Sequence, residues 1–230
     1  MFLGHYGVAL GTKRAAPRTS LGTLVFAAQW LDELWPILLL LGIEKVRIAP
    51  GLMKASALDF VSYPVSHSLL TATGWALLIG GGYYLLRRRA ADAWVVGAAV
   101  LSHWLLDVPV HRPDLPLWPG SSVRVGLGAW NSIALTLILE LGIFGLGLLL
   151  YLRATRARDR IGRWGLAALV AVLLLIFLGG VGGAPPPSER VLAWVTLTIW
   201  VFIPWAWWVD RHREPRSLRD DTRAPHALEV

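Results

Sequence analysis

The sequence of 230 residues contains no cysteine and few charged residues. Without cysteine, the chain cannot form disulfides, iron–sulfur clusters or thiolate zinc sites, so any metal site must use imidazole and carboxylate groups. Charged residues make up 16% of the chain and hydrophobic residues 55%, whereas a typical soluble domain is about a quarter charged. The mean hydropathy is +0.54, and the apolar residues form long blocks. This composition predicts an all-α integral membrane protein.

Six apolar blocks are long enough to cross a bilayer, which predicts a helical bundle of about six transmembrane helices in one domain over residues 1–209. A shorter run, Phe2–Gly11, predicts an additional embedded or interfacial helix. Residues 210–230 are predicted to be a polar, disordered tail, and their last four residues resemble the start of a tag linker. The predicted spans are Leu21–Ile43, Val65–Leu86, Ala93–Val110, Leu127–Leu152, Trp164–Val181 and Val191–Val209.

The positive charges fall mainly between alternate apolar blocks. In the predicted topology, sixteen Lys and Arg residues lie on one side of the membrane and six on the other. Because positive loops stay in the cytoplasm, both termini are expected on the cytoplasmic side of a prokaryotic inner membrane. The net charge of +7 could instead suggest a nucleic-acid partner. However, no groove-reading motif is present, so we expect no nucleic acid to bind.

One apolar segment carries three polar side chains at four-residue steps: His103, Asp107 and His111. A helix turns about 100° per residue, so His103 and Asp107 share one face, and His111 continues that face unless Pro109 bends the helix. Ionisable groups at this depth are costly unless they are paired, and they usually serve a function. The alternative interpretation is a buried His–Asp hydrogen bond with a purely structural role.

Other ionisable residues lie within or beside the predicted spans. His67, His103 and Asp107 fall in the outer halves of their spans, and Asp32 falls near mid-depth, so these groups can converge. His5 fits less easily, because it precedes cytoplasmic charges. Imidazole and carboxylate groups are ligands for divalent metals. We therefore predict a site for one or two divalent ions, with Zn²⁺ as the first choice. The predicted ligands are His5, Asp32, His67, His103 and Asp107.

Two further residues are candidates for a catalytic role, Glu33 and His111. Adjacent helical residues point in different directions, so only one of Asp32 and Glu33 is expected to face the metal, and we favour Asp32. Glu33 would then serve as a general base or hydrogen-bond a ligand. Alternatively, one of the two pairs with an arginine of a neighbouring helix.

Three residues are assigned supporting roles. Ser68 is expected to hydrogen-bond a ligand, with Ser66 as the N-cap of its helix. Glu140 is a lone carboxylate in an apolar span, and it either orients a ligand histidine or is neutral and structural. Arg112 lies next to the predicted site and could bind a phosphate, or it anchors the chain at the membrane interface.

These fragments together resemble the YdjM-type membrane-bound metal-dependent hydrolases of bacteria and archaea. The resemblance covers about residues 4–119 and implies hydrolysis without naming a substrate. Family members commonly have Asp-x-Asp where this chain has Asp32-Glu33, and a missing ligand would leave one metal instead of two. The fragments are Gly4-His5, Leu31-Asp32-Glu33, Ser66-His67-Ser68, Leu101–Asp107 and Pro116–Pro119.

We therefore expect a membrane-embedded hydrolase in which a bound metal lowers the pKa of water to ~7. A site in the outer leaflet would receive its substrate laterally, which favours a membrane lipid with an ester or phosphoester bond. The alternative is a proton- or metal-ion-coupled transporter or channel that uses the same His/Asp cluster. A second alternative is a membrane scaffold without catalytic activity. The sequence leaves the oligomeric state open.

Overall fold

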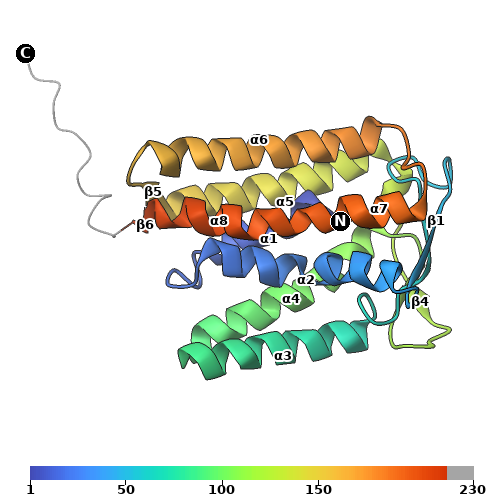
Figure 1. Ribbon diagram of the computed structural model, residues 1–230, viewed down its shortest axis with the longest axis horizontal. Coiled ribbons are helices and arrows are strands. Elements are labelled where there is room, and N and C mark those ends of the chain that lie inside the picture. Colours follow the sequence, from blue (N-terminus) through green and yellow to red (C-terminus); the bar gives the residue numbers. More distant parts are fainter. Residues whose placement is uncertain (217–230) are drawn as a thin grey trace, which may run out of the picture.

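The computed structural model describes residues 1–216, and residues 217–230 lie outside the described part. In this part, six helical segments are long and apolar enough to cross a membrane, as predicted. They run side by side along the long axis of the molecule (Figure 1). The first five are α2 (Leu21–Leu40), α3 (Leu69–Arg87), α4 (Ala90–Val110), α5 (Ile133–Ala154) and α6 (Arg160–Gly182).

The sixth span is interrupted by a short 3₁₀ segment. It consists of α7 (Glu189–Thr196), η2 (Leu197–Val201) and α8 (Phe202–Arg211). Pro204 explains the interruption, because a proline ring clashes with the carbonyl four residues earlier, which here belongs to Trp200. In the same way, Pro36 inside α2 leaves the carbonyl of Asp32 without its α-helical donor. Helix α2 nevertheless continues through this position.

Side-chain caps determine where most spans begin. In each cap an oxygen accepts the backbone N–H three residues further on, at 2.9–3.3 Å, which pairs a group that the helix leaves free. Two spans begin later than predicted: α3 begins after Ser68 and not at Val65, and α5 begins after Ser132 and not at Leu127. His67 therefore lies in the turn before α3. The spans predicted from Ala93, Trp164 and Val191 begin earlier, at Ala90, Arg160 and Glu189. The caps are Ser20, Ser68, Ser132, Asp159 and Ser188.

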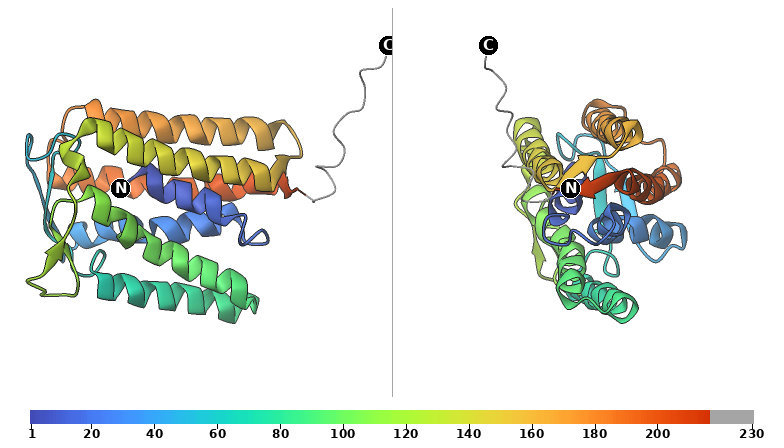
Figure 2. Two further views of the ribbon diagram at one scale, coloured as in Figure 1. Left: turned by 180° about the vertical axis from the view of Figure 1, so that it is seen from behind. Right: turned by 90° about the vertical axis from the view of Figure 1, so that its left-hand side faces the viewer.

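The short helix α1 (Leu3–Thr12) lies inside the bundle, so the predicted extra helix is embedded and not interfacial (Figures 1 and 2). Seven of its ten residues are buried. Its approach to α5 depends on two glycines: a Cβ on Gly147 would lie 1.9 Å from the carbonyl oxygen of Gly7. Small residues allow membrane helices to approach this closely. The contact brings His5 into the interior.

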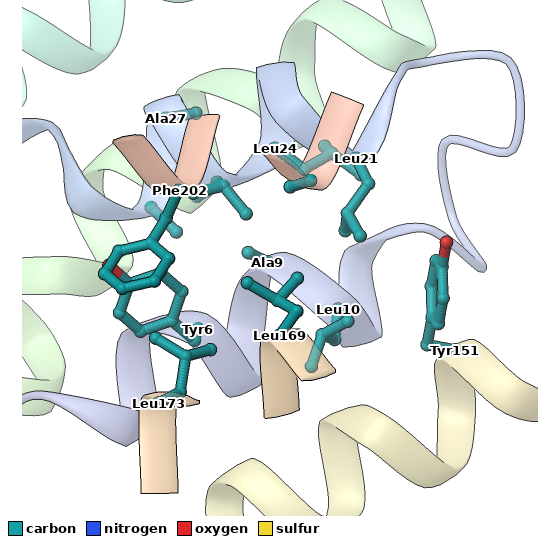
Figure 3. Close-up of a cluster of buried hydrophobic side chains, with 14 of the residues drawn as sticks. Tyr6, Ala9, Leu10, Leu21, Leu24, Ala27, Tyr151, Leu169, Leu173 and Phe202 are labelled. Atoms are coloured by element: carbon teal, nitrogen blue, oxygen red, sulfur yellow. The ribbon is translucent and has the colours of Figure 1, made fainter. Parts of the chain in front are cut away.

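A hydrophobic core packs around α1 and connects it to the helices on either side (Figure 3). Within a bilayer, such packing stabilises the bundle through close contacts and not through removal of water. The core fixes the position of α1 relative to α2, which carries a predicted ligand. The side chains include Tyr6, Ala9 and Leu10 of α1, Leu21 and Leu24 of α2, Leu169 and Leu173 of α6, and Phe202 of α8.

Short antiparallel strand pairs lie at both ends of the bundle (Figure 1). One end, which we call the hairpin end, carries the loops after α2 and α4, with β1 (Lys45–Ile48), β2 (Leu58–Ser62), β3 (Leu115–Pro116), β4 (Arg124–Val125) and η1 (Ala129–Asn131). The opposite end, which we call the basic end, carries β5 (Thr155–Ala157) and β6 (Arg213–Pro215).

Strand β6 corrects the prediction that the chain is disordered from residue 210 onward. Helix α8 continues to Arg211, and Arg213–Pro215 pairs with β5. The pairing is supported by Arg213, whose guanidinium donates to Thr155 Oγ1 at 3.0 Å and to the carbonyl of Gly162 at 2.8 Å. The remainder of the predicted tail, residues 217–230, lies outside the described residues.

The unequal charge of the two ends predicts that the hairpin end faces away from the cytoplasm. The chain has no cysteine, so single cysteines can be labelled without background. Lys54→Cys at the hairpin end is expected to react with a membrane-impermeant maleimide in intact cells. Arg158→Cys at the basic end is expected to react only after lysis. Both positions are exposed, so the opposite pattern would reverse the orientation.

A second prediction concerns the contact between α1 and α5. Gly147→Ala is expected to destabilise the fold by about 1–3 kcal/mol, because its Cβ would overlap a backbone oxygen that no side-chain movement can relieve. Gly142→Ala is the control, since a Cβ there meets no atom within 4 Å. Thermal unfolding in detergent measures both variants. Equal stability of the two would show that the close approach does not depend on glycine.

Candidate metal centre

Ionisable side chains from four segments meet inside the bundle, towards the hairpin end. Two groups of three have potential ligand atoms within 4.8 Å of one another, and they share His103. The first group is His5, His103 and Asp107, and the second is Asp32, His67 and His103. We call these five residues the His/Asp cluster. The sequence predicted all five as ligands, and the structure places them where they could hold a metal ion.

Four of the five residues form a ring in which imidazoles alternate with carboxylates. His67 Nε2 lies 3.5 Å from Asp32 Oδ1 and 3.7 Å from Asp107 Oδ2. His103 Nε2 lies 3.6 Å from Asp32 Oδ1 and 3.5 Å from Asp107 Oδ2. Hydrogen bonds are shorter, at ~2.7–3.2 Å. Zinc–ligand distances of ~2.0–2.2 Å place neighbouring tetrahedral ligands ~3.3–3.6 Å apart. The ring spacing is therefore closer to that of ligands around a shared ion.

A backbone contact determines which nitrogen of His103 carries a proton. Its Nδ1 lies 2.8 Å from the carbonyl oxygen of Ala28, and a carbonyl only accepts, so Nδ1 is the donor. In a neutral imidazole, Nε2 is then an acceptor. This Nε2 is buried and has no hydrogen-bond partner among the described residues. An acceptor that faces two carboxylates needs a positive charge between them, from a proton or a metal ion.

His67 is oriented by a serine, although not by the serine that the sequence indicated. Its Nδ1 lies 2.7 Å from Ser66 Oγ, and Ser66 in turn donates to Glu44 at 2.6 Å. Ser68, the predicted partner, instead caps α3 by accepting from Thr71 at 3.3 Å. The prediction had exchanged the two serines. Sequence reasoning missed Glu44, because a carboxylate in a loop is ordinarily solvated.

His5 joins the cluster through Asp107. Its Nε2 lies 3.2 Å from Asp107 Oδ1, and its ring stacks on that of His103 with centroids 3.5 Å apart. The amino group of Met1 also contacts Asp107 Oδ1. His5 therefore lies at Asp107 Oδ1, whereas His67 and His103 lie at Oδ2 of the same carboxylate. The difficulty that the sequence raised for His5 disappears, because α1 lies inside the bundle.

Glu140 contacts the backbone of α1 and not a ligand side chain. Its carboxylate accepts the N–H of Phe2 at 2.9 and 3.1 Å and that of Gly4 at 2.9 Å. These N–H groups belong to the start of a helix, where no intrahelical acceptor exists. Glu140 thus positions His5 indirectly, by holding the start of α1. A direct hydrogen bond between Glu140 and a ligand, which the sequence suggested, does not form.

His111 and Arg112 lie in a separate polar network at the hairpin end. Helix α4 ends at Val110, and His111 has an extended backbone, so its ring leaves the face shared by His103 and Asp107. His111 Nδ1 lies 3.0 Å from Asp114 Oδ1, and burial lowers the pKa of His111. Arg112 donates to Asp114 at 3.2 Å and also contacts Asp59. Two carboxylates therefore occupy the guanidinium that was predicted to bind phosphate.

Glu33 does not join the His/Asp cluster. Its side chain is fully buried, and neither of its carboxylate oxygens has a hydrogen-bond partner among the described residues. Asp32 is the residue of this pair that reaches the cluster, as the geometry of adjacent helical positions predicts. Asp32 is also the most open ligand: its side chain is 25% exposed, against 4% or less for His67 and 0% for His103. The cluster is therefore most open at Asp32.

The fold and the cluster define a polytopic membrane protein with a buried His/Asp site that could hold a metal ion. The chain belongs to the family described as YdjM inner membrane protein, whose model matches residues 49–185. The match includes three cluster residues, His67, His103 and Asp107, and the other two lie before it. No curated protein and no solved structure matches the chain. The family description indicates an inner membrane and names no activity.

The cluster predicts that the purified protein binds one or two equivalents of zinc. His103→Ala is expected to lose most of this zinc, because it removes the residue that both groups share. His212→Ala is the control, since this imidazole pairs with Asp159 at 2.7 Å, away from the cluster. Metal analysis after dialysis measures the content. A wild-type protein without zinc, or a His103→Ala variant with the full amount, would contradict the assignment.

Proposed function

We propose that the protein is a membrane-embedded metal-dependent hydrolase that cleaves an ester or phosphoester bond of a membrane lipid. The observation that carries the proposal is the ring of alternating imidazoles and carboxylates at 3.5–3.7 Å, with a buried and unpartnered His103 Nε2. Nitrogen and oxygen donors of this kind suit zinc. When bound, such an ion polarises a substrate oxygen and makes water more acidic.

The charge and the hydrogen bonds of the cluster residues favour the binding of a cation. Asp32 and Asp107 supply two negative charges that offset a divalent ion, and the amino group of Met1, which contacts Asp107, adds a positive charge beside them. His67 and His103 each use Nδ1 for a hydrogen bond outside the ring. Their Nε2 atoms therefore remain available as donors to the metal. His5 adds a third imidazole at Asp107 Oδ1, the oxygen that the amino group of Met1 also contacts.

The position of the site favours a lipid substrate. Three of the five cluster residues lie on membrane-spanning helices, namely Asp32 on α2 and His103 and Asp107 on α4. Asp32 forms the accessible side, whereas the other ligands exclude water by their burial. A lipid can present its ester group at this depth, which a soluble molecule cannot do without crossing apolar surface. Hydrolysis adds water across that bond and releases an acid or phosphate and an alcohol.

Hydrolysis is tested with zinc-loaded protein in lipid nanodiscs, using fluorescent phosphatidic acid for the phosphoester and fluorescent diacylglycerol for the carboxyl ester. One of the two is expected to be cleaved at a rate that a chelator abolishes and added zinc restores. His103→Ala is expected to lower the rate by at least about 100-fold, since even partners that only orient a ligand account for 10–100-fold. His212→Ala is expected to retain the wild-type rate.

The main rival is a transporter, because intramembrane histidines and carboxylates also carry protons and metal ions. The same protein is therefore reconstituted into liposomes, and zinc uptake is followed with an internal zinc indicator. Zinc uptake that depends on His103, without cleavage of either lipid, would make the hydrolase proposal wrong and would support transport. Cleavage without uptake supports the hydrolase.

A further inference from the structure

The loop between α2 and β1 carries a buried carboxylate that lies outside the His/Asp cluster. Glu44 is 2% exposed, although it belongs to no spanning helix. Its Oε1 accepts the backbone N–H groups of Val65 and Ser66, both at 2.8 Å, and its Oε2 accepts the hydroxyl of Ser66 at 2.6 Å. A loop carboxylate with three directed donors is held in one orientation.

These hydrogen bonds have a fixed direction. A carboxylate only accepts, so the single hydroxyl proton of Ser66 is used on Glu44. Towards His67 Nδ1, 2.7 Å away, Ser66 Oγ can then only accept. His67 must therefore carry its proton on Nδ1, and in the neutral ring its Nε2 lone pair faces Asp32 and Asp107. The direction is transmitted from Glu44 through Ser66 to the ligand.

We propose that Glu44, acting through Ser66, is a positioning residue that holds His67 in the tautomer that a metal ligand requires. The inference rests on the proposed metal site. It adds that Glu44 determines whether His67 Nε2 has a lone pair free to bind the metal. Ligand histidines commonly donate their second N–H to a carboxylate or a carbonyl. His103 uses the carbonyl of Ala28, whose direction no side-chain substitution can reverse. Of these two histidines, only His67 has a hydrogen bond at Nδ1 whose direction a mutation can reverse.

Glu44→Gln is expected to reverse the direction of the hydrogen bonds that run from residue 44 through Ser66 to His67, without removing them. The amide oxygen is expected to take the Oε1 position, where two backbone N–H groups converge, and this places the amide NH₂ against Ser66 Oγ. Ser66 then accepts from the glutamine and donates to His67 Nδ1. The proton of His67 moves to Nε2, where it points towards Asp32 and Asp107. The Nε2 atom can then no longer bind a metal. Zinc affinity is expected to fall by about 10–100-fold.

The tautomer is measured by ¹⁵N NMR of histidine-labelled protein without zinc, at alkaline pH in detergent, with His67→Ala used to assign the signal. The wild-type His67 is expected to be protonated on Nδ1 and the Glu44→Gln variant on Nε2. Calorimetric titration with zinc gives the affinities. Glu189→Gln is the matched control at the same end, because this exposed carboxylate accepts, among the described residues, only the N–H of Ile48, at 3.3 Å. It is expected to change neither quantity.

A second pair of variants guards against misfolding of Glu44→Gln. Ser66→Ala removes the relay and is expected to weaken zinc binding, whereas Ser66→Thr keeps the hydroxyl and is expected to restore it. The inference is overturned if His67 is already protonated on Nε2 in the wild type, if its tautomer is unchanged in Glu44→Gln, or if Ser66→Ala binds zinc like the wild type. A wild type without zinc affinity would refute the proposed function separately, since the tautomer is measured without metal.

Discussion

The structure depends on the neutralisation of two carboxylates that the bundle encloses. Asp107 is almost fully buried, and Asp32 lies beside it at 25% exposure. Enclosed charge of this kind is stable only with a compensating positive charge. The amino group of Met1 supplies one such charge at Asp107 Oδ1. His67 and His103 use Nδ1 for other contacts, so they can add positive charge only by taking a proton on Nε2. A cation in the ring satisfies both carboxylates and both Nε2 atoms at once, and the neighbouring hydrogen bonds then serve a common purpose.

The same requirement explains why a helix too short to span the membrane lies at the centre of the fold. Helix α1 contributes His5, but it also leaves the first N–H groups of a helix inside an apolar bundle, where no water can pair with them. Glu140 accepts two of these groups. The facing glycines Gly7 and Gly147 let the backbones approach closely enough for this contact. The lone carboxylate of α5 and the glycines of the α1–α5 contact are thus consequences of one buried helix end.

The spans were predictable because length and hydropathy determine them locally, and the pairing of His103 with Asp107 was predictable because helical periodicity determines it. The errors arose where the position of a side chain depends on the backbone conformation at a helix end or on a segment distant in the sequence. An extended backbone after Val110 takes His111 away from the cluster, and a shift of the α3 start to Leu69 exchanges the roles of Ser66 and Ser68. Contacts such as Glu44 to Ser66 join loops on either side of a hairpin, and no local pattern encodes them.

Helix α2 serves as the frame of the site, because one of its turns supplies two groups. The carbonyl of Ala28 accepts from His103 Nδ1, and Asp32 follows four residues later, so its own N–H bonds to that same carbonyl within the helix. A carbonyl oxygen has two lone pairs and can serve both. The relative positions of Asp32 and His103 are therefore set by backbone geometry. His67 lies in a turn, where its backbone N–H donates to the carbonyl of Tyr63 at 3.0 Å and its carbonyl accepts from Trp104 Nε1 at 3.0 Å. Its imidazole Nδ1 contacts a side chain, Ser66 Oγ, so the direction of the hydrogen bonds from Glu44 matters most for this ligand.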